Sequence, residues 1–385
     1  MAAINLPRVV RVGAGALNEL PDAMIQCGLS RPFVVTDAFL QSCGMVERLV
    51  DVLAARGMEA VVFAETVPDP TVAVVELALE RLATSDCDCV IGFGGGSPID
   101  TAKAIAVLAG LKVPMATLKA PSVTDRPGLP IVAVPTTAGT GSEATRFTVI
   151  TDDASNEKML CAVLAFLPTV AIVDFELTMA KPARLTADTG IDSLTHAIEA
   201  YVSKRANPFS DAMAISAMRL IAPHIRTACA DPGNRTAREA MMVGAHHAGI
   251  AFSNASVALV HAMSRPIGAF FHVPHGLSNA MLLPAVTAFS APAALGRYAQ
   301  CARAMGVAGE DEGDQAAVAR LLDELAALNA DLSVPTPRAH GIAQDTWRGL
   351  IPTMARQAIA SGSPANNPRD ADEAAIAALY EEVFG

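Results

Sequence analysis

The stretch Val90-Ile91-Gly92-Phe93-Gly94-Gly95-Gly96-Ser97-Pro98-Ile99-Asp100-Thr101-Ala102-Lys103 decides the fold of the first half of this chain. An apolar run typical of a buried strand leads through three glycines into a helix whose first turn holds Pro98. Glycines there let backbone N–H groups approach a pyrophosphate, and a helix amino end favours negative charge. A tight strand-to-helix turn also selects glycine, and the segment has neither the GxGxxG nor the Walker pattern. The stretch alone therefore predicts a strand, a turn and a helix, and leaves phosphate binding open.

Short β-branched runs alternate with helical patterns from the start of the chain to about residue 185. Strands are expected at Arg8–Val12, Phe33–Thr36, Ala60–Phe63, Cys89–Phe93, Ile131–Val134 and Val170–Asp174. Helices are expected between the earlier ones, at Asn18–Cys27, Met45–Arg56, Thr71–Thr84 and Pro98–Ala109. This alternation predicts a mostly parallel, doubly wound sheet, that is, a Rossmann-like α/β domain. Two further runs, Thr148–Asp153 and Lys158–Cys161, predict a hairpin inserted into that domain.

After Thr186 the strand signals almost vanish, and apolar residues recur at i, i+3 and i+4 in Ala-rich stretches. Helices are expected at Thr186–Ser203, Pro208–Cys229, Ala237–Phe252, Ser256–Ser264, Leu277–Phe289, Ala293–Met305, Gln315–Leu328 and Ala371–Phe384. The composition of Ser361–Pro368 predicts a loop. We therefore expect an α/β domain over residues 1–185 and an all-helical domain over residues 186–385.

Composition narrows the class of protein. A chain of 385 residues with 52% hydrophobic and 17% charged residues is typical of a compact globular protein of two domains. Its formal net charge of -11 disfavours nucleic acid and anionic membranes as partners, because both select basic surfaces. The amino terminus has no uninterrupted apolar segment, and seven scattered cysteines favour reduced thiols. We expect a soluble, cytoplasmic protein that acts on a small molecule.

A second glycine-containing loop, Pro135-Thr136-Thr137-Ala138-Gly139-Thr140-Gly141-Ser142-Glu143, follows another strand. Its hydroxyls and glycines suit contacts to phosphate, ribose or a nicotinamide amide, although a plain Gly/Thr turn explains them as well. Asp37 lies at the carboxyl end of the predicted strand Phe33–Thr36, where an acid can hold a ribose diol and repel a 2′-phosphate. An acidic helix cap is the competing interpretation of Asp37.

Four side chains in the second half are candidate metal ligands. Asp192 and His196 are four residues apart on a predicted helix, so their side chains point the same way from adjacent turns. His261 lies on another helical stretch, and His275 follows a proline at the first turn of the next. Three imidazoles and a carboxylate suit ferrous iron or zinc better than calcium or magnesium. Any one of these histidines alone is more often a buried or capping residue than a ligand.

In their order and spacing, these motifs resemble those of the iron-dependent (group III) alcohol dehydrogenases over nearly the whole chain. The resemblance implies a Rossmann-like NAD(P) domain, an all-α metal-binding domain of the dehydroquinate synthase-like architecture, and substrate in the cleft between them. It also implies one divalent metal, with Fe²⁺ favoured and Zn²⁺ possible, and at least a homodimer. The implied metal ligands are Asp192, His196, His261 and His275. The expected dinucleotide contacts are Asp37, Gly94, Gly95, Gly96, Ser97, Asp100, Thr136, Thr137, Thr140, Ser142 and Lys158.

Two positions depart from the pattern of the resembling family. Many members have a histidine four residues after the third ligand, but this chain has Arg265 there. Proton relay by His272 and binding of an acidic substrate by Arg265 are therefore the expected catalytic roles, and structural roles for both are equally open. Asp69 occupies a position that is often Asn.

The expected activity is NAD-linked hydride transfer between an alcohol and an aldehyde or ketone, with NADP less favoured as the cofactor. The metal would act as a Lewis acid on the substrate oxygen, and hydride would pass between the resulting alkoxide carbon and nicotinamide C4. The alternatives are a hydroxyacid-oxoacid transhydrogenase that retains its nicotinamide, a reductase acting on a carboxylate or phosphonate substrate, and a catalytically silent nucleotide-binding protein. The sequence predicts neither the substrate nor its stereochemistry.

Overall fold

The computed structural model describes residues 2–385 except 123, 125 and 156. The chain divides into two compact units, Asn5–Met179 and Ala180–Gly385, and residues 2–4 group with the second. The division lies a few residues before the predicted boundary of 185/186. Helix α6 (Ala183–Val202) begins between these two positions.

The first unit contains a six-stranded, wholly parallel sheet with the strand order β1-β8-β5-β4-β2-β3. The strands are β1 (Val9–Val12), β2 (Pro32–Asp37), β3 (Val61–Thr66), β4 (Cys89–Gly94), β5 (Ile131–Pro135) and β8 (Val170–Val173). The helices are α1 (Leu20–Gln26), α2 (Ala38–Ser42), α3 (Met45–Ala54), α4 (Val72–Ala83) and α5 (Gly96–Leu111). The predicted doubly wound α/β fold is confirmed, strand by strand.

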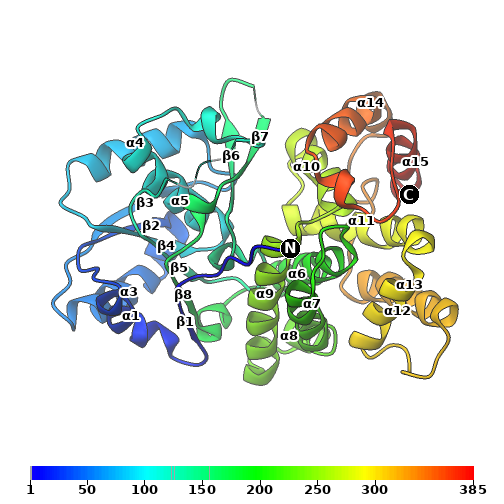
Figure 1. Ribbon diagram of the computed structural model, residues 1–385, viewed down its shortest axis with the longest axis horizontal. Coiled ribbons are helices and arrows are strands. Elements are labelled where there is room, and N and C mark those ends of the chain that lie inside the picture. Colours follow the sequence, from blue (N-terminus) through cyan, green and yellow to red (C-terminus); the bar gives the residue numbers. More distant parts are fainter. Residues whose placement is uncertain (1, 123, 125, 156) are drawn as a thin grey trace. The chain divides into compact units, whose positions relative to one another are not determined.

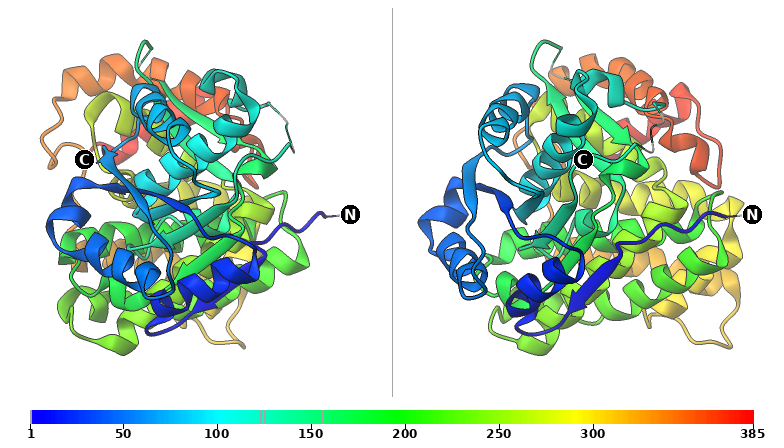
Figure 2. Two further views of the ribbon diagram at one scale, coloured as in Figure 1. Left: turned by 90° about the vertical axis from the view of Figure 1, so that its left-hand side faces the viewer. Right: turned by 60° about the vertical axis from the view of Figure 1, so that its left-hand side comes forward.

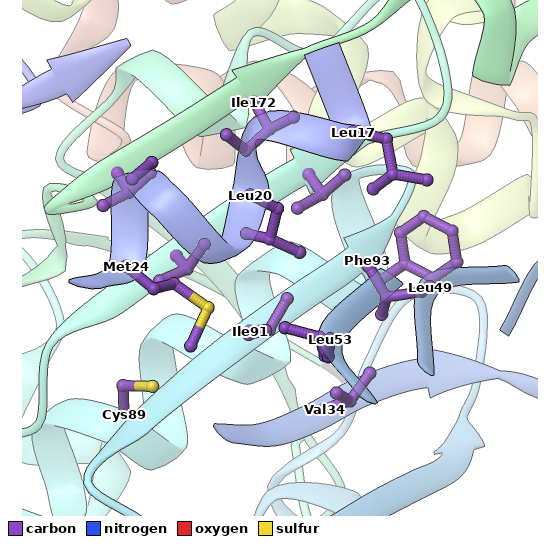
Figure 3. Close-up of a cluster of buried hydrophobic side chains, with 14 of the residues drawn as sticks. Leu17, Leu20, Met24, Val34, Leu49, Leu53, Cys89, Ile91, Phe93 and Ile172 are labelled. Carbon is purple, nitrogen blue, oxygen red and sulfur yellow. The ribbon is translucent and has the colours of Figure 1, made fainter. Parts of the chain in front are cut away.

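Helices cover both faces of this sheet (Figure 1). On one face Leu20 and Met24 of α1 and Leu49 of α3 pack on alternate residues of the central strands, such as Val34 and Ile91 (Figure 3). On the other face α4 and α5 pack on the residues that alternate with these. The strands β4, β5 and β8 are buried on both faces and almost wholly apolar, as is typical of parallel sheets, whereas the edge strands β1 and β3 are partly exposed.

The predicted hairpin is present within the α/β unit. β6 (Phe147–Asp152) and β7 (Glu157–Ala162) pair with each other in a separate two-stranded sheet. Single bridges tie this hairpin to Thr71 and Lys119. The runs predicted at 148–153 and 158–161 match these two strands to within one residue at each end, and the separation of the pair from the parallel strands depends on tertiary contacts.

The strand order places a topological switch point between β2 and β4. From β2 the chain proceeds to β3 on one side, whereas from β4 it proceeds to β5 on the other. In open α/β sheets, ligands bind beyond the carboxyl ends of the strands at such a point. Asp37 ends β2, and Gly94 ends β4.

The second unit is helical throughout its described length (Figures 1 and 2). Its main helices are α6 (Ala183–Val202), α7 (Pro208–Ile221), α8 (Ile225–Ala230), α9 (Arg235–Ala255), α10 (Leu259–Phe271), α11 (His275–Ser290), α12 (Leu295–Ala304), α13 (Asp314–Asp331), α14 (Gln344–Ala360) and α15 (Glu373–Val383). In the part of the chain that the structure describes, no helix combines the length and the apolar character that crossing a membrane demands.

Prolines account for the differences from the predicted helices. The stretch predicted as one helix from Pro208 breaks at Pro223 into α7 and α8. α10 instead continues through Pro266, and α14, which was not predicted, contains Pro352. Trp347 of α14 is fully buried and stacks on Phe271, so tertiary packing outweighs the poor local propensity.

The first turn of α11 lies unusually close to α6. A Cβ built on Gly276 would lie 2.3 Å from the carbonyl oxygen of Asp188 and 3.3 Å from the Cβ of Asp192. No side chain fits at that distance, so glycine is required for the two helices to approach. This contact fixes His275 relative to Asp192.

Gly276→Ala should therefore destabilise the protein by about 2 kcal/mol, because the added methyl group forces two packed helices apart. Urea unfolding measures the change. Gly349→Ala is the matched control, since Gly349 also lies inside a helix but a Cβ there meets nothing within 4 Å. That control should be neutral or stabilising by up to about 1 kcal/mol. Equal stability of the two variants would contradict the packing argument.

Candidate functional site

Helix α6 presents three ionisable side chains along one buried stripe. Asp192, His196 and Glu199 follow one another at i, i+4 and i+7, so they project from successive turns in the same direction. All three are nearly inaccessible to solvent. Buried charged groups are costly unless they are paired or bind a metal, so this stripe needs partners.

Those partners come from α10 and α11. Ligand atoms of Asp192, His261 and His275 all lie within 4.8 Å of one another. His261 Nε2 is 3.5 Å and His275 Nε2 is 3.8 Å from Oδ1 of Asp192. Three of the four predicted ligands are thus brought together as a group with the separations of a metal site.

The side chain of Asn279 shows that these three ligand atoms surround one position. Its Nδ2 lies 2.6 Å from Asp192 Oδ1, 3.2 Å from His261 Nε2 and 3.3 Å from His275 Nε2. A single electropositive nitrogen thus meets three acceptor atoms, while the amide oxygen of the same side chain is buried without a hydrogen-bond partner. The lone pairs converge on one point, and the donor set of imidazoles and a carboxylate fits a divalent transition metal.

Glu199 fixes the orientation of His261. Its Oε2 accepts a hydrogen bond from Nδ1 of His261 at 2.6 Å, and its Oε1 accepts from the backbone N–H of Val260 at 2.6 Å. With the proton held on Nδ1, Nε2 is free to bind a cation. Burial alone would lower the pKa of His261, but Glu199 and Asp192 outweigh it and raise that pKa to about 8.

His196 lies beside the group rather than within the set that the distances define. Its ring stacks on His261 with 4.4 Å between centroids and on Phe252 with 4.2 Å. Burial would raise the pKa of Asp192, but the imidazoles of His196, His275 and His261 together hold it well below its usual range. Asp192 is therefore an anion among imidazoles, and His196 is close enough to act on its charge.

The group is closed on one side and open on the other. The side chains of Asp192 and His261 are 3% and 4% exposed, whereas that of His275 is 44% exposed. Catalytic metal sites keep one coordination position accessible, while structural sites are closed. Access on the side of His275 is consistent with a catalytic site.

The two predicted catalytic residues have different surroundings. His272 is the C-cap of α10 in the left-handed conformation, with φ 55, and its side chain is exposed. Arg265 is partly buried one turn after His261, and its Nη1 donates to Ser363 Oγ at 3.2 Å. Ser363 belongs to the 3-10 helix Ser363–Asn366.

In the first unit, the two predicted nucleotide loops lie side by side. Gly94 pairs with Pro135 in the sheet, and the N–H of Thr136 donates to the carbonyl of Gly94 at 2.8 Å. A Cβ on Gly96 would lie 3.0 Å from the methyl group of Thr140. Two adjacent loops at the carboxyl ends of β4 and β5 therefore contain the expected contacts Gly94, Gly95, Gly96, Ser97, Thr136, Thr137 and Thr140.

Two other expected contacts, Asp100 and Ser142, have side chains bound to the protein itself. Ser142 Oγ donates to Asp100 Oδ1 at 2.7 Å, and the N–H of Val149 donates to Oδ2 at 2.9 Å. The fully buried Lys103 donates to Ser142 Oγ and to acceptors of Thr145 and Phe147. This network holds the loop against α5, so a positioning role explains Asp100 and Ser142 better than direct contact.

The remaining expected contacts, Asp37 and Lys158, also have partners. Asp37 is the N-cap of α2, and its Oδ1 accepts from the N–H of Leu40 at 2.9 Å. The acidic helix cap is therefore present, and a ribose contact through the other oxygen stays a prediction. Lys158 pairs with Asp69 at 2.8 Å, which gives the unexplained Asp69 a partner.

Glu199 and Asn279 were not among the predicted site residues. Both lie at helical spacing from ligands: Glu199 is three residues after His196, and Asn279 is four after His275. That spacing is the signal that could have found them.

Known proteins match this chain over nearly its whole length. Residues 7–175 match the family described as iron-containing alcohol dehydrogenase, and residues 186–384 match the C-terminal part of the Fe-containing alcohol dehydrogenase family. Lactaldehyde reductase of Escherichia coli (strain K12) is 37% identical over 375 residues, 97% of each chain. The NAD-dependent methanol dehydrogenase of Bacillus methanolicus is 36% identical over 98% of this chain and 99% of its own. The solved structure of a 1,3-propanediol oxidoreductase covers 100% of both chains with a TM-score of 0.95 and 35% identity.

Glu199→Gln should weaken metal binding by roughly 10- to 100-fold, because the amide no longer holds the proton on Nδ1 of His261 as a carboxylate does. Titration of chelator-stripped protein with Co²⁺, followed by its visible absorption, measures the affinity. Glu199→Asp, which keeps the charge, should recover part of it. Unchanged Co²⁺ affinity in the Gln variant would show that Glu199 has no influence on the site.

Lys103→Met should lower the free energy of unfolding by about 2 kcal/mol or more, because it leaves several buried acceptors without a donor. Lys119→Met is the control, since the ammonium group of Lys119 forms an exposed ion pair with Glu157 and its loss should matter by less than about 1 kcal/mol. Urea unfolding compares the two variants. NADH binding, followed by fluorescence, should also weaken in Lys103→Met alone if the network positions the loop.

Proposed function

Because the chain belongs to the iron-containing alcohol dehydrogenase family, we propose that its helical unit holds one divalent metal for hydride transfer between an alcohol and a nicotinamide. The protein is an oxidoreductase acting on CH–OH groups. The proposed metal ligands are Asp192, His196, His261 and His275. The convergence of Asp192, His261 and His275 on the amide nitrogen of Asn279 is the observation that carries this proposal.

The protein residues have separable tasks in this scheme. When bound, the metal supplies a Lewis acid for the substrate oxygen, and the nicotinamide supplies or accepts the hydride. Asp192 contributes the negative charge, and Glu199 keeps the proton on Nδ1 of His261. The exposed face of His275 leaves room for the substrate oxygen. His272, exposed and three residues before His275, is placed to exchange a proton with solvent.

Fe²⁺ is our proposal for the metal. Three imidazoles and one carboxylate accommodate either ferrous iron or zinc, and the name of the matching family favours iron. The donor set lacks the oxygen ligands that calcium and magnesium require.

The cofactor we propose is NAD, bound at the carboxyl ends of β4 and β5. The glycine loop offers backbone N–H groups and the amino end of α5 to the pyrophosphate, and the threonine loop lies beside it. Lys158 and the second carboxylate oxygen of Asp37 are the proposed polar contacts nearby. An acid at Asp37 disfavours a 2′-phosphate, so we infer preference for NAD over NADP.

We further propose a cytoplasmic homodimer that acts on a small alcohol or aldehyde. All seven cysteines are unpaired, as expected from the sequence, and free thiols are typical of a reducing compartment. The related proteins that support a small substrate are named for lactaldehyde and methanol. Sedimentation at equilibrium tests the dimer, which a monomeric mass would exclude.

Removal of the metal should abolish turnover while leaving dinucleotide binding intact, because the two are held by different units. Protein purified without oxygen should contain about one metal per chain, and chelation should stop NADH oxidation with lactaldehyde or propanal. Fe²⁺ or Zn²⁺ should restore it, and NADPH should be the poorer reductant. Fluorescence titration with NADH before and after chelation is the control. Full activity in protein stripped of metal would refute the proposal.

A further inference from the structure

Arg265 is a partly buried cation that lacks a matching anion among the described residues. Its guanidinium forms no ion pair with any residue in the described part of the chain, and the hydrogen bond to Ser363 joins it to a neutral hydroxyl. A guanidinium has five N–H donors, so most of its capacity is unused. Burial lowers the pKa of Arg265 to about 10 despite an opposing effect of Glu199, but the group remains charged at neutral pH.

Glu199, the acid that acts on the charge of Arg265, already has hydrogen-bond partners of its own. Glu199 accepts from His261 and from the backbone of Val260 through both oxygens, and its carboxylate is not within 4 Å of Arg265. With one divalent cation bound, the two buried carboxylates of Asp192 and Glu199 would balance its charge. The charge of Arg265 is then left over.

The position of Arg265 directs that charge toward the site. Arg265 lies four residues after His261 on α10, so both side chains project from one face of the helix with their Cβ atoms about 5–6 Å apart. Ser363, the partner of Arg265, is buried at the start of a short 3-10 helix after Gly362, whose φ of 75 lets the chain turn back toward α10. One short substrate could therefore place its anionic group at Arg265 and its reacting oxygen near His261.

We propose that Arg265 binds an anionic group on the substrate, so that the enzyme prefers short carbonyl or hydroxy compounds carrying a carboxylate, sulfonate or phosphonate over neutral ones. The planar fork of the guanidinium matches the paired oxygens of such groups. This inference rests on the proposed metal-dependent function of the same site.

The test compares anionic and neutral aldehydes of similar length: succinic semialdehyde with butanal, and sulfoacetaldehyde with propanal. In the wild type, kcat/KM from NADH oxidation should be higher for the anionic member of each pair. Arg265→Met should lower the anionic-to-neutral ratio by roughly 10- to 100-fold, as expected for the loss of a charged hydrogen-bond partner. Arg265→Lys should keep part of the ratio, because it retains the charge without the fork. Arg356→Met, on the exposed side of α14, is the charge-matched control and should keep the wild-type ratio.

A binding measurement separates this proposal from the activity itself. Propionate and ethanesulfonate should raise the melting temperature of the wild type and of Arg356→Met, but not that of Arg265→Met. An equal loss on both substrates of a pair, or an equal rise in melting temperature in Arg265→Met, would overturn the role of Arg265 and leave the dehydrogenase intact. Absence of turnover with every aldehyde in metal-loaded wild type would overturn the proposed function instead, and the melting temperatures would still decide whether Arg265 binds anions.

Discussion

The hydrogen bond between Glu199 and His261 is the interaction on which the candidate site depends. It joins α6 to α10 inside the helical unit, and it determines which nitrogen of His261 faces Asp192. Without it, the imidazole could rotate or exchange tautomers, and the separation of 3.5 Å between its Nε2 and Asp192 would have no cause. The close approach permitted by Gly276 then brings α11 to the same place. These two helix contacts bring His261 and His275 next to Asp192 of α6.

The sheet unit solves a different physical problem. Its loops present backbone N–H groups at the carboxyl ends of the parallel strands. Hydrogen bonds from buried side chains beneath the loops hold them in place. The buried ammonium group of Lys103 binds acceptors from both the threonine loop and the hairpin, while Asp100 anchors the same elements from α5. Polar residues that looked like ligand contacts in the sequence thus act one layer beneath the surface.

Much of the fold was predictable because its signals are local. All six parallel strands and most helices follow from apolar periodicity. Residue type and helical spacing also singled out Asp192, His261 and His275, whose ligand atoms the structure brings together. The failures involve tertiary compensation. α14 contains Gly349 and Pro352, and it is stabilised by Trp347 packing on Phe271 and Tyr380, contacts that local propensity cannot reveal. The pairing of Arg265 with Ser363 and of Lys158 with Asp69 likewise joins segments far apart in the sequence.

The candidate ligands lie on separate helices, which has a consequence for the stability of the helical unit. Asp192 and His275 are far apart in the chain, so an ion gripping both would act as a cross-link comparable to a disulfide, restricting the unfolded ensemble. The helical unit should accordingly melt at a higher temperature when loaded than when stripped, and calorimetry can compare the two forms. A single bound ion would then contribute both to catalysis and to the stability of the helical unit.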